Sequence, residues 1–265
     1  MNLFSRKVSK VEDSFFRKSY FSLVKRFSKG LLEIGAHQGE VAQYFLSHAD
    51  INVISYEANP FNVEHYELDS IGVRSGAVVP GHEKTITLNI PRRAWQTNDD
   101  AHSGKGSVLN RQDGDFDNFL TVSVPCVNIN KPLAELKSHN SVWMDCEGLS
   151  LPLISSITKE NLKNIDFIYA EFETTPVFSG SNTLNDLGDW LIGSPFQILG
   201  KARTSHNQYN VILVNKTMQK FHPILFFGYK SIYALFSFIF STLHPLISLP
   251  GKIISALSRV VTKRS

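Results

Sequence analysis

The feature that most constrains the fold of this chain is an alternation of short, β-rich apolar runs with helical patterns between residues 31 and 215. Such an alternation is typical of a parallel sheet covered by helices. We expect helices at 39–47, 61–68, 132–137, 149–157 and 183–191, and a long polar loop at 92–117. The expected strands are 31–34, 52–56, 73–78, 85–90, 121–127, 142–144, 167–171, 196–199 and 210–214. The 265-residue chain is therefore predicted to hold one large α/β domain with appended ends.

The ends of the chain differ from this middle part in charge. Residues 1–30 hold eight lysines and arginines against two acids, residues 216–265 hold seven against none, and residues 31–215 hold 12 against 22. We therefore divide the chain into a basic amphipathic N-terminal extension (1–30), a central domain (31–215) and a basic hydrophobic C-terminal extension (216–265). An acidic central domain is a poor general partner for nucleic acid. Basic ends rich in Phe and Leu suit an anionic membrane surface or packing on the domain.

The C-terminal extension contains a run, 231–251, of 21 residues without a charged side chain. Prolines and polar residues interrupt the run, so helices lying in a membrane interface fit it best. Packing against another protein or the domain comes next, and a spanning helix fits least well. The first thirty residues lack the apolar stretch of a secretory signal. Two cysteines, Cys126 and Cys146, suit a reducing compartment. We expect a cytoplasmic protein, membrane-associated through its two extensions.

A strand that leads into an acid and a glycine turn opens the central domain, in LLEIGAHQG at 31–39. Its glycines let the backbone turn sharply and approach a ligand at the carboxyl edge of the sheet. The glycine order differs from the Gly-x-Gly-x-x-Gly of dinucleotide-binding folds, and the acid would repel a pyrophosphate. An acid beside the turn suits a cofactor with positive charge and no phosphate, such as S-adenosylmethionine. We expect Glu33, Gly35, Ala36, His37 and Gly39 to contact this cofactor.

A second acid, Glu57, ends the next expected strand, 24 residues after Glu33. This spacing is close to that at which a carboxylate accepts hydrogen bonds from the ribose hydroxyls of an adenosine. We expect Glu57, Ala58 and Asn59 to complete the cofactor site. A surface glutamate at a strand end is the alternative, but the ordered pair of motifs rarely arises by chance.

Two later strands also deliver acids to the same edge of the sheet. Asp145 and Glu147 follow the run 142–144, and Glu171 and Glu173 end the next one. Asp145 is our first candidate for the general base that takes the proton of an acceptor hydroxyl, with His37 and Glu147 as the other candidates. A divalent ion on the acids would be a second way to acidify a hydroxyl. No metal-ligand spacing such as His-Glu-x-x-His occurs, and the predicted site contains no metal.

These motifs, in this order, resemble those of the FkbM-type methyltransferases. The resemblance covers about residues 30–215 and is carried by the segments 31–40, 56–60, 76–78, 106–109, 145–148, 170–171 and 210–214. It implies a Rossmann-like class I methyltransferase fold, with a seven-stranded, mostly parallel sheet whose last strand is reversed. It also implies methylation of a hydroxyl on a natural product, a sugar or a lipid-linked glycan. The chain departs from the family pattern at Ile129-Asn130, Trp143 and Ser150, all on the acceptor side of the motifs.

The sequence therefore predicts an S-adenosylmethionine-dependent O-methyltransferase that acts on a hydroxyl of a glycan, lipid-linked sugar or natural product. A methyltransferase acting on nucleic-acid bases would usually carry an Asn/Asp-Pro-Pro-aromatic loop for the flipped base, and none occurs. A catalytically inactive, membrane-attached binding or assembly module on the same fold is the alternative, because the departures lie near Gly148.

Overall fold

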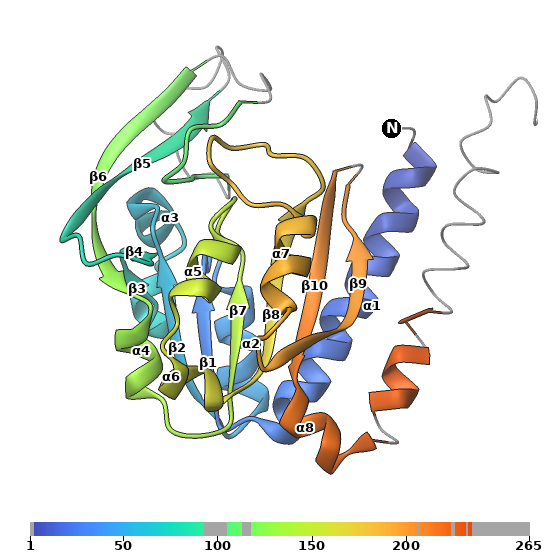
Figure 1. The fold of residues 1–265 in the computed structure, drawn as a ribbon. Coiled ribbons are helices and arrows are strands. Elements are labelled where there is room, and N and C mark those ends of the chain that lie inside the picture. Colours follow the sequence, from blue (N-terminus) through green and yellow to red (C-terminus); the bar gives the residue numbers. More distant parts are fainter. Residues whose placement is uncertain are drawn as a thin grey trace, which may run out of the picture.

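A seven-stranded sheet runs through the middle of the molecule, as the ribbon in Figure 1 shows. The computed structural model describes residues 3–92, 105–112, 118–205, 207–223, 226–231 and 233–234. The strand order is β3-β2-β1-β7-β8-β10-β9, and β10 is antiparallel to both of its neighbours while the other pairs are parallel. The prediction of a Rossmann-like class I methyltransferase fold with a reversed last strand is confirmed. The strands are β1 Gly30–Ile34, β2 Asn52–Glu57, β3 Arg74–Ser75, β7 Asn140–Met144, β8 Ile165–Glu173, β9 Phe196–Arg203 and β10 Gln208–Asn215.

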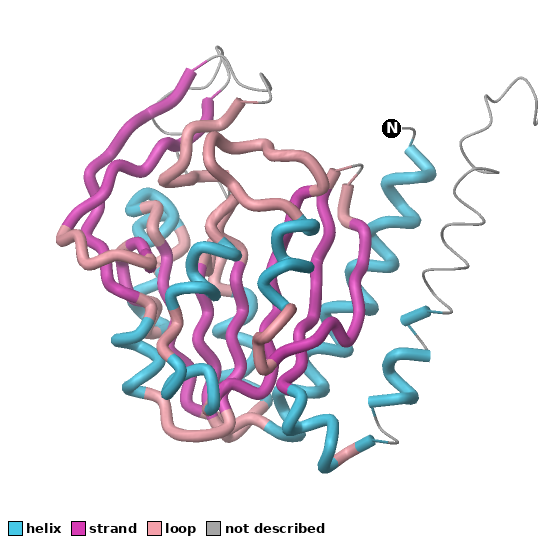
Figure 2. Tube along the Cα trace, viewed as in Figure 1, coloured by secondary structure: helices cyan, strands magenta, loops and turns pink. Residues whose placement is uncertain are grey.

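A second, three-stranded sheet stands beside the first, in the order β4-β6-β5, and both sheets are magenta in Figure 2. It consists of β4 Ala77–Val79, β5 Thr85–Arg92 and β6 Asn118–Asn128. The run 73–78, expected as one strand, divides at Gly76, whose φ of 142° separates β3 in the large sheet from β4 in the small one. Of the expected long loop at 92–117, Arg92 ends β5 and the structure describes 105–112, while 93–104 and 113–117 lie outside the described residues.

Helices cover both faces of the large sheet (Figure 2). They are α1 Leu3–Phe27, α2 Glu40–His48, α3 Pro60–His65, the 3-10 helix η1 Leu68–Ile71, α4 Asn130–Glu135, α5 Ser150–Ser156, α6 Lys159–Lys163, α7 Leu184–Leu191 and α8 Lys216–Phe221. The five predicted helical segments are present. Two short helices, α6 and α8, were not predicted; they begin at caps, where the Thr158 side chain accepts from Asn161 N–H and that of Asn215 from Thr217 N–H.

Side chains alternate between two cores along the sheet strands. On one face, Val142 and Met144 of β7 pack with the cluster that contains α5 and α7 residues. On the other face, Trp143 and its stacking partner Tyr169 on β8 pack with α1 and α2. Asp145 and Glu171 each come two positions after one of these aromatic residues. They are therefore expected on the α1 side of the sheet, at its carboxyl edge.

The helix α1 packs its apolar side on the sheet. Phe16, Tyr20, Leu23 and Val24 are buried, and the Tyr20 hydroxyl donates to the Val142 carbonyl at 2.8 Å. Of the arrangements considered for residues 1–30, packing on the domain is therefore the one seen for the side chains from Asp13 onward. No helix in the described part of the chain is long and apolar enough to cross a membrane. Most of the run 231–251 lies outside that part.

Candidate functional site

A cavity that opens to solvent lies at the carboxyl edge of the large sheet. The ends of β1, β2 and β7, the start of β4 and the segment 106–108 surround it. Its lining consists of Ile34, Gly35, His37, Tyr56, Glu57, Ala58, Asn59, Gly76, Ala77, Val78, Leu88, Gly106, Ser107, Val108, Asp145, Cys146 and Leu149. This is the edge at which open α/β sheets bind ligands.

The turn after β1 forms one side of the cavity, and it requires glycine at position 35. Gly35 has a φ of 85°, and its N–H and that of Ala36 donate to the Tyr56 carbonyl at 2.9 and 3.0 Å. A Cβ atom at Gly35 would lie 1.9 Å from the carbonyl oxygen of Asp145, and the Asp145 N–H donates to the Ile34 carbonyl at 2.9 Å. The turn therefore touches β7 closely enough to bring the predicted cofactor loop and Asp145 into one cavity.

The carboxylate of Glu57 is held by a ring of donors at the end of β2. Its Oε2 accepts from the backbone N–H of His37 at 2.7 Å, and its Oε1 accepts from Asn59 N–H at 2.9 Å and from the Asn62 side-chain amide at 3.0 Å. Burial raises the pKa of Glu57, and these donors oppose that rise because they favour the ionised form. The side chain is thus fixed in one orientation at the wall of the cavity.

His37 contributes its backbone to this arrangement. The residue has a φ of 49°, which lies in the left-handed region, and this conformation aims its N–H at Glu57. Its ring packs edge-on to Tyr66, with 5.7 Å between the ring centres. His37 therefore lines the cavity and also joins the turn after β1 to the end of β2.

Three of the predicted cofactor residues support the turn from behind and do not line the cavity. Glu33 is buried, accepts a short hydrogen bond from the Ser55 hydroxyl and accepts from the Ala42 N–H in the first turn of α2. Burial raises the pKa of Glu33 to about 7. Ala36 is buried in a small apolar cluster, and Gly39 forms the N-cap of α2 in a left-handed conformation. Gly35, His37, Glu57, Ala58 and Asn59 do line the cavity.

Asp145 follows directly after β7, is exposed and lines the cavity. Desolvation by the surrounding protein raises the pKa of this carboxyl. The positive charges of Arg17 and Lys105 oppose the rise, and the negative charge of Asp13 adds to it. A carboxyl group with a raised pKa is a better proton acceptor than an ordinary one. Asp145 thus brings a carboxyl group with a raised pKa to the cavity wall.

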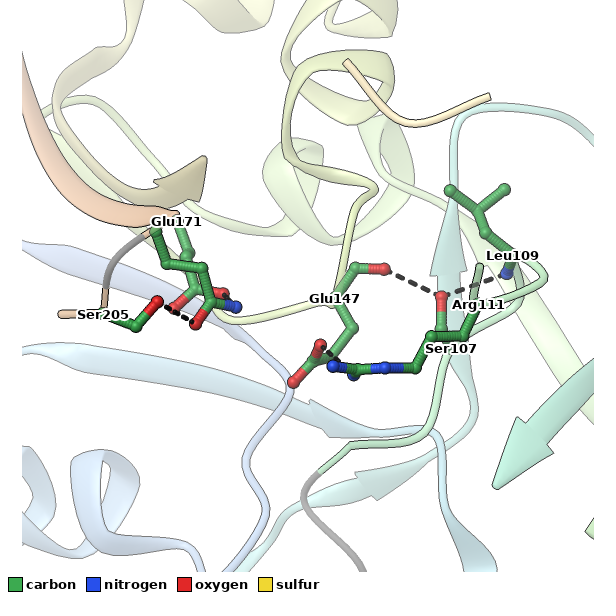
Figure 3. Close-up of polar contacts among 7 residues, drawn as sticks. Ser107, Leu109, Arg111, Glu147, Glu171 and Ser205 are labelled. Carbon is green, nitrogen blue, oxygen red and sulfur yellow. Dashed lines mark hydrogen bonds and ion pairs between the residues drawn. The ribbon is translucent and has the colours of Figure 1, made fainter. Parts of the chain in front are cut away.

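Glu147 does not line the cavity. Its φ of 43° turns the side chain toward Arg111, whose Nη1 lies 3.8 Å from Oε2, and Figure 3 shows this ion pair beside Glu171. Burial and the charge of Asp145 raise the pKa of Glu147 to about 7. Glu171 accepts from the Gln208 side-chain amide at 3.0 Å, and burial raises its pKa well above the ordinary value. The acids after β7 and β8 thus form a group next to the cavity.

The segment 105–112 joins this group to the small sheet. The Ser107 hydroxyl donates to the Glu147 carbonyl at 2.8 Å and accepts from Leu109 N–H at 3.0 Å, as drawn in Figure 3. Ser107 also pairs with Asn89 of β5 through two backbone hydrogen bonds. Sequence reasoning assigned no role to Asn62, Ser107 or Arg111, although the glycine-serine pair at 106–107 within a long polar loop was a signal for Ser107.

Within the residues that the structure describes, no group of three or more His, Cys, Asp or Glu side chains is arranged to hold a metal ion.

No protein-family model matches the chain, and no curated protein matches it. Solved structures match at low identity. The N-terminal domain of EvdMO1 with SAH bound is 12% identical, with 78% of this chain and 80% of that chain covered and a TM-score of 0.39. A putative RNA methyltransferase from Pyrococcus horikoshii is 10% identical, with 78% and 84% covered and a TM-score of 0.38. A protein in the NADB-Rossmann superfamily from Streptococcus agalactiae is 13% identical, with 89% and 88% covered and a TM-score of 0.36. The resemblance to FkbM-type methyltransferases stays a prediction.

Proposed function

We propose that this chain is an S-adenosylmethionine-dependent methyltransferase whose cofactor lies in the cavity between Gly35, Glu57 and Asp145. The observation that carries the proposal is the fixed carboxylate of Glu57 at the cavity wall. A carboxylate offers about four acceptor positions, and the three donors around Glu57 leave about one for a ligand hydroxyl. A ribose hydroxyl is such a donor.

The rest of the cavity fits the same cofactor. Gly35 lines the cavity and carries no side chain, so a ligand can approach its backbone closely. Glu57 and Asp145 line the cavity, and Glu33 lies behind it, which favours a ligand with positive charge and disfavours a pyrophosphate. Bound there, S-adenosylmethionine would supply a methyl group on a positively charged sulfur.

The proposed reaction is transfer of that methyl group to a hydroxyl of a glycan, a lipid-linked sugar or a natural product, as the FkbM resemblance implies. The role of the chain is to hold the acceptor oxygen in line with the methyl carbon and to accept the hydroxyl proton. Asp145 is the proposed base because it lines the cavity and its pKa is raised. His37 also lines the cavity and is the second candidate; Glu147, paired with Arg111, is the third.

The test is formation of SAH by the purified full chain with S-adenosylmethionine and a panel of hydroxylated sugars, glycolipids and small alcohols. Loss of a general base typically lowers the rate about 10²–10⁴-fold, so Asp145→Asn should lower turnover in that range. Asp50→Asn, at an exposed position after α2, is the matched control and should leave it unchanged. Cofactor binding without turnover on any acceptor would favour the inactive binding module, and turnover unaffected by Asp145→Asn would move the base to His37 or Glu147.

A further inference from the structure

The end of α1 and the start of α8 meet at the amino edge of the large sheet, opposite the cavity (Figure 1). The side-chain amide of Asn215, the cap of α8, donates to the carbonyl of Ile165, the first residue of β8. The ring of Phe27 at the end of α1 lies 4.9 Å from that of His222, just after α8. Two segments far apart in the sequence therefore share one corner of the molecule.

One side of the segment 216–234 anchors it to the domain. Phe226 is fully buried, with its ring 6.1 Å from Phe167, and Tyr233 is 6% exposed, with its ring 5.2 Å from Phe16. Met218 of α8 is also buried. These buried side chains hold the segment against the domain, so the side chains on its outer side face solvent in a fixed arrangement.

The outer side presents two large aromatic side chains to solvent. Phe221 and Phe227 are each 73% exposed, although a phenylalanine gains about 1.5–3 kcal/mol from full burial. They are six positions apart in the chain. Two large apolar side chains exposed on one short segment suit a surface that contacts an apolar partner.

Exposed basic residues lie on α8 and on the end of α1, which meets it. Lys25 and Arg26 are exposed in the last turn of α1, and Lys216 and Lys220 are exposed on α8. The segment 216–234 contains no aspartate or glutamate. The Lys216 ammonium donates to the neutral Ser194 carbonyl at 2.6 Å, so its charge is not cancelled by that contact.

We propose that Phe221, Phe227, Lys25, Arg26, Lys216 and Lys220, here called the α8 surface, dock on an anionic lipid bilayer. Phenylalanine side chains enter the interface between headgroups and acyl chains, and lysines and arginines contact the anionic headgroups. The chain that continues beyond Ala234 has matching chemistry, because residues 235–265 contain four lysines and arginines, many apolar residues and no acid. Both the positive charge and the apolar side chains therefore favour an anionic lipid bilayer as the partner of this surface.

The experiment is co-sedimentation of the full chain with vesicles of phosphatidylcholine alone and of phosphatidylcholine mixed with phosphatidylserine. We expect binding to the anionic vesicles that weakens as salt is added, because salt screens the attraction. The double variant Phe221→Ser/Phe227→Ser should bind about tenfold or more weakly. Lys220→Gln should weaken binding about fivefold at low salt.

Phe119→Ser is the matched control, because Phe119 is 41% exposed on β6 in the small sheet. It should bind vesicles like the unaltered chain. Unchanged melting temperatures would show that the variants fold. SAH binding should be unchanged in the double phenylalanine variant and in Lys220→Gln, because the cavity lies at the other edge of the large sheet. No binding to anionic vesicles at low salt, or binding that is equal for the unaltered chain and the double phenylalanine variant, would overturn the proposal. Neither result would bear on the cofactor site.

Discussion

At the scale of single residues, backbone contacts decide which groups can meet at the cavity. Gly35 touches the Asp145 carbonyl, and His37 and Asn59 present N–H groups to Glu57. These residues could be predicted from the sequence, because glycines and acids at the ends of expected strands form a recognisable sequence pattern. It did not predict that Glu33 faces α2 or that Glu147 turns toward Arg111, because those directions depend on the pleat of β1 and on a left-handed residue.

Replacing Gly35 by alanine should destabilise the fold. The new Cβ would lie 1.9 Å from the Asp145 carbonyl and the residue would keep a φ of 85°, so overpacking and the left-handed conformation together should cost roughly 2–5 kcal/mol. Gly72→Ala is the control, because Gly72 has a φ of 79° but nothing within 4 Å of its Cβ position. It should cost only about 1–2 kcal/mol. Urea unfolding measures both, and equal losses would show that the contact with Asp145 does not matter.

The buried carboxyl of Glu33 should make stability depend on pH. Its pKa rises from 4.5 to about 7 on folding, so the folded chain binds this proton more tightly and the contribution of Glu33 to stability falls as pH rises through that interval. Glu33→Gln removes the dependence. Relative to the unaltered chain, the variant should gain up to about 3 kcal/mol between about pH 5 and about pH 8, measured by urea unfolding. Glu64→Gln, at an exposed position of α3, should show no such gain.

At the scale of elements, the periodicity of the sequence located the strands and helices, but packing decided which sheet a strand joins and where a helix lies. The run 73–78 reads as one strand, but Gly76 donates its N–H to the Glu57 carbonyl at 2.8 Å and turns the chain from the large sheet into the small one. The sequence of the first helix is amphipathic and basic, which fits packing on the sheet and also contact with a membrane. Only the aromatic partners on β7 and β8, distant in the sequence, decide where its apolar side packs.

Tyr20 should therefore be a main anchor of α1. It is fully buried, packs on Trp143 and Tyr169, and donates to the Val142 carbonyl. Tyr20→Phe should cost about 0.5–1.5 kcal/mol for the lost hydrogen bond, and Tyr20→Ala about 3–5 kcal/mol. The exposed Ser22→Ala is the control. A chain whose unfolding free energy is insensitive to Tyr20→Ala would show that α1 does not pack on the sheet in solution.

At the scale of the whole molecule, two edges of one sheet carry different chemistry. The carboxyl edge gathers acids around a cavity, and the amino edge carries basic residues and exposed aromatic groups at the α8 surface. The separation of charge along the sequence anticipated this division. The separation in space could not be read from it, because it arises from the path of the reversed strand β10, which ends at the amino edge and begins α8 there.

Titration calorimetry of the full chain with S-adenosylmethionine, SAH and NAD tests the cofactor site most directly, with Glu57→Gln as the variant and Glu64→Gln as the control. We predict saturable binding of both adenosyl ligands and none of NAD. Glu57→Gln should weaken adenosyl binding by about 1–3 kcal/mol, because its amide group would face the donors that now hold the carboxylate and would leave a ligand hydroxyl unpaired. Binding of NAD in place of the adenosyl ligands, or adenosyl binding that is indifferent to Glu57→Gln, would contradict the assignment of this cavity to S-adenosylmethionine.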